Sequence, residues 1–272
     1  MEKQGKSVRL QDHIILLGTG NAHATRCYNT CFTLHSSGGS VLLVDAGGGN
    51  GIFTQLEKAG LALEDIQDIF VTHAHTDHLL GVVWLIRTML EEKYTLRVWS
   101  HGKVLDLLSL ICRQTIHAKD VKGIGSLVTM HRLEDGDDFE VGDIRLQCFD
   151  IHSSKEPQYG SLATMPDGKR VCCLGDEPYN PLNRPYAERA DWLMSEAFCL
   201  YEDRDRFRPY EKNHSTALDA AMLAEELRVR NLLLYHTEDY TLDTRKERYA
   251  HEAKTRFQGR VWVPDDLERI DL

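Results

Sequence analysis

The sequence lacks the long apolar stretch that a membrane-spanning helix requires, so we expect no membrane span. Its first residues, Met1 to Gln11, are polar and charged, and they lack the apolar core of a signal peptide. The 32 basic residues are outnumbered by 42 acidic ones, which gives a net charge of −10 and leaves no basic stripe of the kind that nucleic-acid binders carry. Low-complexity segments and short repeats are absent as well.

Cysteines are few and do not suggest a disulfide framework. The seven cysteines are odd in number and scattered, which favours a reducing, cytoplasmic location. Cys172 and Cys173 are adjacent in an apolar run, and we expect both to be small core residues. With 272 residues, 42% of them hydrophobic and 27% charged, the chain has the composition of one globular domain over residues 1–272.

Short apolar runs alternate with helical patterns along the whole chain. Strands are expected at 14–17, 31–34, 40–44, 127–131, 144–149, 160–164, 170–174, 190–194 and 232–235. Helices are expected at 51–59, 79–92, 104–117, 215–227 and 240–257. This order of elements predicts an α/β (α+β) protein in which two sheets form a sandwich with helices on the outside.

The segment 72–78 reads THAHTDH and directly follows the apolar run 66–71. Imidazole and carboxylate groups are typical ligands of Zn²⁺ and similar divalent ions. His73 and His75 are two positions apart, so at the end of a strand they can point the same way at one metal. Asp77 and His78 can turn toward a second metal. The pattern H-x-H-x-D-H therefore predicts a site for two metals.

A two-metal site needs about six or seven protein ligands, and this motif supplies only four. His152, Asp176 and His236 are the other candidates, because each follows an apolar strand that would deliver it to a loop. Asp176 can bridge two metals with its two carboxylate oxygens. His214 opens a helix and is a candidate for catalysis instead. We expect Glu177 behind the ligands or in solvent, and the following histidines at the surface or satisfied in the core: His23, His35, His101, His117, His131 and His251.

These residues resemble the metallo-β-lactamase superfamily, which combines H-x-H-x-D-H with a lone histidine, a Gly-Asp pair and a late histidine. The segment 45–47, Asp-Ala-Gly, resembles the superfamily's early Asp-x-Gly element. Residues 17–20, LGTG, and 195–197, Ser-Glu-Ala, are similar to elements of the ribonuclease Z group, and 214–216, His-Ser-Thr, matches its more specific element. The resemblance covers about residues 13–240. It implies a four-layer αββα sandwich, with two mixed sheets flanked by helices.

The resemblance also implies a role for each site residue. It assigns the first metal to His73, His75 and His152, and the second metal to Asp77, His78 and His236, with Asp176 as the bridge. Asp45 would stand behind the ligands and hold one of the histidines. The catalytic residues would be Asp77, which can also contact the nucleophile, His214 and Glu196, which orients His214.

The chemistry that follows is hydrolysis of a phosphodiester. Two divalent ions lower the pKa of a bridging water, so that a hydroxide attacks phosphorus near neutral pH. His214 then acts as general acid toward the leaving oxygen. Zn²⁺ is the expected ion, and the same donors accept Mn²⁺ and Fe²⁺. The implied substrate is the 3′ end of tRNA or a smaller phosphodiester, and the resemblance further implies a homodimer.

Two departures from the ribonuclease Z pattern concern the substrate. Longer ribonuclease Z enzymes carry a tRNA-gripping arm between the lone histidine and the Gly-Asp aspartate. Here His152 and Asp176 are only 24 positions apart and a hairpin fills the interval, so no arm is expected. The segment 201–212 carries several arginines and Lys212 among acidic residues, which is typical of a solvated loop, with a lid or a substrate-binding edge as the alternative.

Two other classes of function stay open at this point. One is a hydrolase of the same fold that acts on a lactone, thioester, β-lactam or sulfate ester, none of which would need the His-Ser-Thr element. The other is a non-catalytic protein that binds a metal or a partner, which the full set of metal ligands disfavours.

Overall fold

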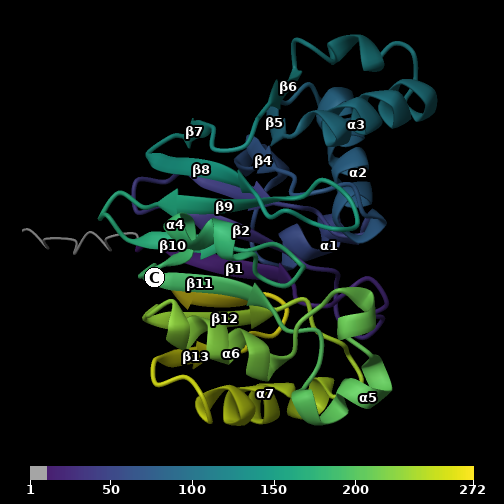
Figure 1. Ribbon diagram of the computed structural model, residues 1–272. Coiled ribbons are helices and arrows are strands. Elements are labelled where there is room, and N and C mark those ends of the chain that lie inside the picture. Colours follow the sequence, from purple (N-terminus) through teal and green to yellow (C-terminus); the bar gives the residue numbers. More distant parts are fainter. Residues whose placement is uncertain (1–10) are drawn as a thin grey trace, which may run out of the picture.

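The computed structural model describes residues 11–272, whose strands form two seven-stranded sheets (Figure 1). The first sheet has the order β14 (Glu268–Asp271), β1 (His13–Gly18), β2 (Cys31–His35), β3 (Val41–Val44), β4 (Asp68–Phe70), β5 (Leu96–Ser100) and β6 (Val128–Arg132). The second has the order β13 (Arg260–Trp262), β12 (Asn231–Tyr235), β11 (Trp192–Glu196), β10 (Arg170–Cys173), β9 (Tyr159–Thr164), β8 (Ile144–Asp150) and β7 (Asp138–Val141). The polar segment expected over Met1 to Gln11 lies, apart from Gln11, outside the described residues.

Helices cover the outer face of each sheet, which confirms the expected αββα sandwich. Against the first sheet lie α1 (Gly51–Lys58), α2 (Thr76–Glu92) and α3 (Gly102–Thr115); against the second lie α4 (Arg184–Ala187), α6 (Ala217–Glu226) and α7 (Arg245–Lys254). In Figure 1, α6 lies over β11 and β12, and α3 with the segment that follows it projects at the upper right. Alternate residues of each strand fill different layers: Ile14 and Leu16 pack between the sheets, whereas Ile15 and Leu17 pack under the helices.

Both sheets have a parallel half, and the functional loops lie at its carboxyl edge. Strands β3 to β6 run parallel to one another, as do β10 to β13. Ligand sites in such sheets form in the loops that follow the carboxyl ends of the strands. The segments after β3, β4, β10, β11 and β12 therefore meet at one end of the sandwich.

The predicted elements agree with the structure where the apolar pattern is strong. Helix α2 begins at Thr76, three residues before the expected start, so Asp77 and His78 lie in its first turn. The helix expected over 240–257 is shorter, because α7 covers only Arg245–Lys254. No strand was expected at β5, β7, β13 or β14, which are short and each contain a charged residue that weakens the apolar pattern.

The cysteines form no disulfide bonds among the described residues, in agreement with their odd number and scattered positions. All seven cysteines are free thiols and six of them are buried. Cys172 packs under the helices of the second sheet and Cys173 between the sheets, so both are core residues as expected. Within residues 11–272, no helix combines the length and the apolar character needed to cross a membrane.

A pair of stacked histidines joins β1 to β2. The rings of His13 and His35 lie 4.3 Å apart at 9°, and both side chains are buried. His35 Nε2 is 2.8 Å from Thr33 Oγ1, and His13 Nδ1 is 2.8 Å from the carbonyl oxygen of Gln11. Burial, and then the neighbouring His13, lowers the pKa of His35 to about 4. The pair is therefore a core contact of two neutral rings.

This pair should make the protein sensitive to acid. Between pH 6.5 and pH 4 the unfolded chain protonates His35 and the folded chain does not, so the free energy of unfolding falls as the pH is lowered through this window. In His35→Phe the ring remains and the proton site is lost. We expect its stability, measured by urea unfolding, to fall by about 2 kcal/mol less than that of the wild type between pH 7 and pH 5. Equal losses in the two proteins would contradict the lowered pKa.

Candidate active site

Six of the seven predicted metal ligands lie together at the carboxyl edge of the parallel strands. They form two clusters whose ligand atoms lie within 4.8 Å of one another: one of His73, His75 and Asp176, and one of Asp77, His78 and His236. His73 and His75 lie on the loop after β4, and Asp77 and His78 on the first turn of α2. Asp176 and His236 follow β10 and β12, as predicted from the apolar runs before them.

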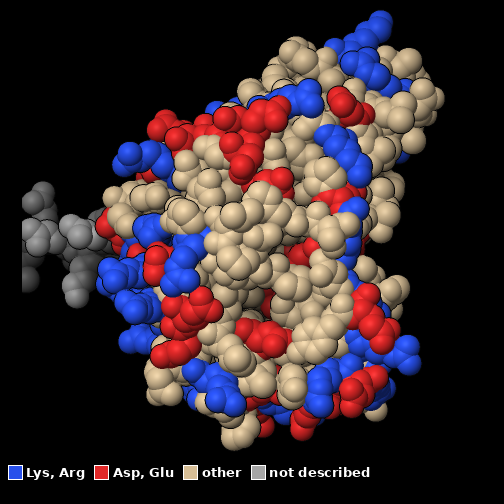
Figure 2. Space-filling model, viewed as in Figure 1, with Lys and Arg blue, Asp and Glu red and all other residues tan. Residues whose placement is uncertain are grey.

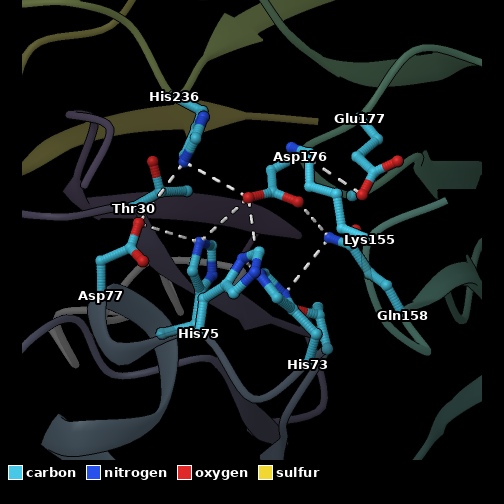
Figure 3. A network of polar contacts seen from close by, with 12 residues as sticks. Thr30, His73, His75, Asp77, Lys155, Gln158, Asp176, Glu177 and His236 are labelled. Carbon is cyan, nitrogen blue, oxygen red and sulfur yellow. Dashed lines mark hydrogen bonds and ion pairs between the residues drawn. The ribbon is translucent and has the colours of Figure 1, made fainter. Parts of the chain in front are cut away.

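The carboxylate of Asp176 lies between the two clusters (Figure 3). Its Oδ2 atom is 3.5 Å from the Nε2 atoms of His73, His78 and His236. Asp77 Oδ2 is 3.4 Å from His78 Nε2 and 3.6 Å from His236 Nε2. One carboxylate oxygen thus faces ligand atoms of both clusters, as a bridging ligand would.

Asp45 stands directly behind this arrangement. Its Oδ2 atom is 2.7 Å from His78 Nδ1, and it also accepts a hydrogen bond from the Thr72 hydroxyl at 2.7 Å. That hydroxyl is 2.9 Å from His73 Nδ1. Because a carboxylate oxygen accepts hydrogen bonds, His78 Nδ1 donates to Asp45, and Nε2 is the nitrogen that faces Asp77 and Asp176.

Helix α2 lies close enough to the loop after β3 for His78 to contact Asp45, because residue 81 is glycine. A Cβ atom at Gly81 would overlap the carbonyl oxygen of Ala46. The backbone of the helix instead bonds to the loop after β3, from Gly81 N to the carbonyl of Gly47 at 2.8 Å and from Ala46 N to the carbonyl of His78 at 3.1 Å. The segment 45–47 and the start of α2 are thereby joined at the site.

The unpartnered nitrogens of the site fit divalent cations. Among residues 11–272, the Nε2 atoms of His78 and His236 are buried and have no hydrogen-bond partner. A buried polar atom without a partner is costly, and a metal ion would relieve that cost. Burial opposes the charge of Asp176, but neighbouring His73 outweighs it and holds the pKa of that carboxyl well below its usual range. The carboxylate is therefore ionised and ready to act as a ligand.

His214 and Glu196 form a buried pair next to the second cluster. His214 Nδ1 is 3.5 Å from Glu196 Oε2, and the His214 ring is 5.4 Å from that of His236. Glu196 ends β11, and its other oxygen accepts a hydrogen bond from the backbone N–H of Ser215. The imidazole also stacks on Phe198, with ring centroids 4.6 Å apart. Nδ1 of the ring therefore faces Glu196 without a hydrogen bond between them, and Nε2 is turned away from Glu196.

A pocket of about 360 Å³ opens onto these groups. Its wall includes His75, Asp77, Asp176, His214 and His236, together with Ala22, His23, Ala74, Thr76, Lys155, Phe198 and Lys212. A volume of this size suits a small molecule. His23, which we expected to be a surface or core histidine, is exposed on the rim of this pocket.

His152 is the predicted ligand that the structure does not bring to the clusters. Its side chain is 36% exposed, with Nδ1 4.0 Å from Asp150 Oδ2. Its backbone N–H donates to Asp150 Oδ1 at 2.7 Å, and its φ of 59° is left-handed, so the chain turns here and carries the ring outward. The assignment of His152 to a metal stays a prediction.

Gln158 contacts the first cluster and was not among the predicted residues. Its Nε2 atom is 3.2 Å from His73 Nδ1, and it donates a hydrogen bond to Asp176 Oδ1. Glu177, expected behind the ligands or in solvent, is buried and accepts hydrogen bonds from Ser153 and Asn213. No motif or spacing in the sequence points to these contacts, because they depend on how the loop after β8 folds back.

Known proteins share this fold over nearly their whole length. The metallo-β-lactamase fold protein YhfI of Bacillus subtilis superposes with a TM-score of 0.77 at 20% identity, covering 96% of this chain and 99% of that one. The short form of human tRNase Z gives a TM-score of 0.73 at 21% identity, covering 95% and 98%. In sequence, the chain is 25% identical to ribonuclease Z of Myxococcus xanthus, over 95% of this chain and 97% of that protein.

The fold and the two histidine–aspartate clusters define a metal-dependent hydrolase of the metallo-β-lactamase fold, as the sequence predicted. The family can be stated more narrowly. Residues 13–258 match the family described as Anti-Pycsar protein Apyc1, and the chain belongs to that family.

Removing the acceptor behind His78 should weaken metal binding. In Asp45→Asn the side-chain amide can donate where the carboxylate only accepted, so His78 loses its orienting partner. Changes of this kind typically lower metal affinity by about 10- to 100-fold, and we expect a loss in this range for Zn²⁺ in a chelator competition titration.

Asp68→Asn is the matched control, because Asp68 is buried on neighbouring β4 and bonds to Arg97 and Trp99 instead. Equal Zn²⁺ affinities of Asp45→Asn and the wild type would show that Asp45 does not support a ligand.

Proposed function

We propose that this protein is a metal-dependent phosphodiesterase that hydrolyses small phosphodiesters. The observation that carries the proposal is the His214–Glu196 pair, which is buried beside the second cluster and opens onto the same pocket. Hydrolysis of a phosphodiester releases an alkoxide, which needs a proton donor at the leaving oxygen. The relatives named ribonuclease Z support this reaction class.

The residues that would hold two metals are the members of the two clusters, with Asp176 between them and His152 as a further ligand of the first ion. The mixed nitrogen and oxygen donors suit Zn²⁺ best, and Mn²⁺ or Fe²⁺ as alternatives. Bound ions would supply a water of lowered pKa and would neutralise charge on the phosphoryl oxygens.

The side chains of the pocket supply the rest of the chemistry. Glu196 orients the His214 ring through Nδ1, which leaves Nε2 directed toward the pocket to donate a proton. Phe198 and the buried surroundings restrict the movement of that ring. The pocket is large enough for a phosphodiester with one nucleoside-sized substituent.

Two features favour a small substrate over tRNA. Strands β9 and β10 form a hairpin in the interval between His152 and Asp176, where the tRNA-gripping arm would be inserted. Figure 2 shows acidic side chains gathered in the region of β7 and β8. The exposed acidic residues of β7 and of the segment before it are Glu134, Asp135, Asp137, Asp138 and Glu140. A phosphate backbone would be repelled there. Processing of tRNA is the second candidate, because of the relatives named ribonuclease Z.

The family's name adds a context to this proposal. The family that matches residues 13–258 is described as Anti-Pycsar protein Apyc1. We propose that this chain also acts against the Pycsar system, and that its small phosphodiester substrate belongs to that system.

Metal-loaded protein should hydrolyse small diesters and leave tRNA intact. The substrates are bis(p-nitrophenyl) phosphate, 3′,5′-cyclic mononucleotides, which fit the pocket by size, and a 3′-extended precursor tRNA. Asp77→Ala should lose bound metal and turnover together, measured by elemental analysis and by product formation, because Asp77 lies in the second cluster.

Each other outcome has a distinct meaning. Accurate cleavage of the tRNA after the discriminator base, absent in Asp77→Ala, would show that tRNA, and not a small phosphodiester, is the substrate. No turnover of any phosphodiester by fully loaded protein would contradict the proposal and favour another bond, such as that of a lactone, thioester, β-lactam or sulfate ester.

Replacing His214 should separate catalysis from metal binding. We expect His214→Ala to keep its metal content and to lose about 10²- to 10⁴-fold in kcat toward a diester with a poor leaving group, because a general acid contributes this much. His117→Ala, at an exposed position after α3, is the control and should match the wild type. If His214→Ala lost metal in proportion to activity, His214 would be a ligand and not a proton donor.

A further inference from the structure

A lysine of the loop after β8 lies beside the proposed proton donor. Lys155 Nζ is 3.5 Å from His214 Nε2, and its side chain is 28% exposed. The lysine lines the same pocket as Asp176 and His236. Its ammonium group is therefore close to the ring nitrogen from which His214 would give up its proton.

Glu177 is the carboxylate that faces this lysine. Its side chain is 4% exposed, and Oε1 lies 3.8 Å from Lys155 Nζ (Figure 3). The same carboxylate accepts a hydrogen bond of 2.5 Å from Ser153 Oγ and one of 2.5 Å from Asn213 Nδ2. Glu177 thus joins the loop of Lys155 to the residue before His214.

The ammonium group of Lys155 has hydrogen-bond donors left with which it can bind a ligand. The contact with Glu177 is longer than a hydrogen bond, and the contact with His214 is at the outer limit of one. The neighbouring Glu156 does not neutralise Lys155, because its carboxylate is 2.9 Å from Lys103 Nζ and 3.7 Å from His75 Nε2. A cation anchored in this way stabilises negative charge that develops nearby during a reaction.

We infer that Lys155 is a further catalytic residue, which stabilises the charge on the leaving oxygen of the phosphodiester, and that Glu177 is its positioning residue. The inference rests on the proposed phosphodiesterase function. Water forms the new bond to phosphorus, and the bond from phosphorus to the leaving oxygen breaks with its electron pair on that oxygen. The oxygen takes the proton of His214, which regains one from the attacking water. Lys155 donates a hydrogen bond to the same oxygen and keeps its protons.

This assignment narrows the class of substrate. An acidic phenol leaves readily without help, whereas an alcohol such as a sugar hydroxyl carries much more charge as it leaves. A proton donor and a cation at one oxygen therefore suit esters of weakly acidic alcohols. The structure assigns such a leaving group to the side of the pocket that His214 and Lys155 share.

Lys212 provides a matched control. It lines the same pocket and has the same charge, but its Nζ atom lies over the ring of Phe198, 5.0 Å from the centroid. Lys155→Met and Lys212→Met therefore remove the same charge from two parts of one pocket. An effect of net charge on substrate attraction would be similar in both variants.

The experiment compares methyl phenyl phosphate, which has the poorer leaving group, with methyl p-nitrophenyl phosphate. We expect Lys155→Met to lower kcat about 100-fold for the phenyl ester and about tenfold or less for the p-nitrophenyl ester, with unchanged metal content. Lys155→Arg should restore part of the loss. Glu177→Gln should show the same dependence on the leaving group with a smaller loss, and Lys212→Met should change KM equally for both esters.

A loss of equal size for both esters in Lys155→Met would overturn the inference, since a lysine that only holds the loop affects every substrate alike. If the wild-type protein hydrolyses neither ester, the proposed function fails, and titration calorimetry with inorganic phosphate tests the lysine separately. A Kd for phosphate raised at least tenfold more in Lys155→Met than in Lys212→Met would support an anion contact at Lys155 beyond the effect of net charge. Equal Kd values in all three proteins would exclude it.

Discussion

The geometry of the site depends on the buried carboxylate of Asp45. It follows β3 with a left-handed φ of 55° and accepts hydrogen bonds from the backbone and hydroxyl of Thr72, while its Oδ2 atom also faces His78 Nδ1. One side chain therefore connects three segments of the chain: the end of β3, the loop after β4 and the first turn of α2. A buried carboxylate needs such partners, and by binding them it sets which nitrogen of His78 faces the clusters.

Much of this site could be predicted from the sequence, because its residues directly follow apolar strands. Asp176 and His236 were identified by the runs before them, and both lie where the parallel strands end. The strands that were not predicted are mostly short or near a sheet edge, such as β13 and β14, which offer few apolar residues. Their pairing with a neighbouring strand, more than their own composition, makes them strands.

The structure differs most from the sequence prediction in the loop after β8 and in the side chains that this loop contacts. His152 follows a strand like the other candidates, but β8 pairs with antiparallel strands and the turn after it carries the ring outward. Lys155, Gln158 and Glu177 reach the site through contacts between loops that are distant in sequence. No periodicity reports such contacts, so loop conformation sets the limit of what the sequence predicts here.

One edge of the first sheet is formed by β14, which comes from the other end of the described chain. Strand β1 pairs with β2 on one side and with β14 on the other, where Leu16 lies opposite Glu268. During synthesis, β1 therefore leaves the ribosome long before its second partner exists. Until β14 arrives, the nascent chain presents an apolar strand with an unpaired edge, the kind of edge that invites pairing with other chains. The two histidine–aspartate clusters are also completed late, because His236 is synthesised long after His73 and His78.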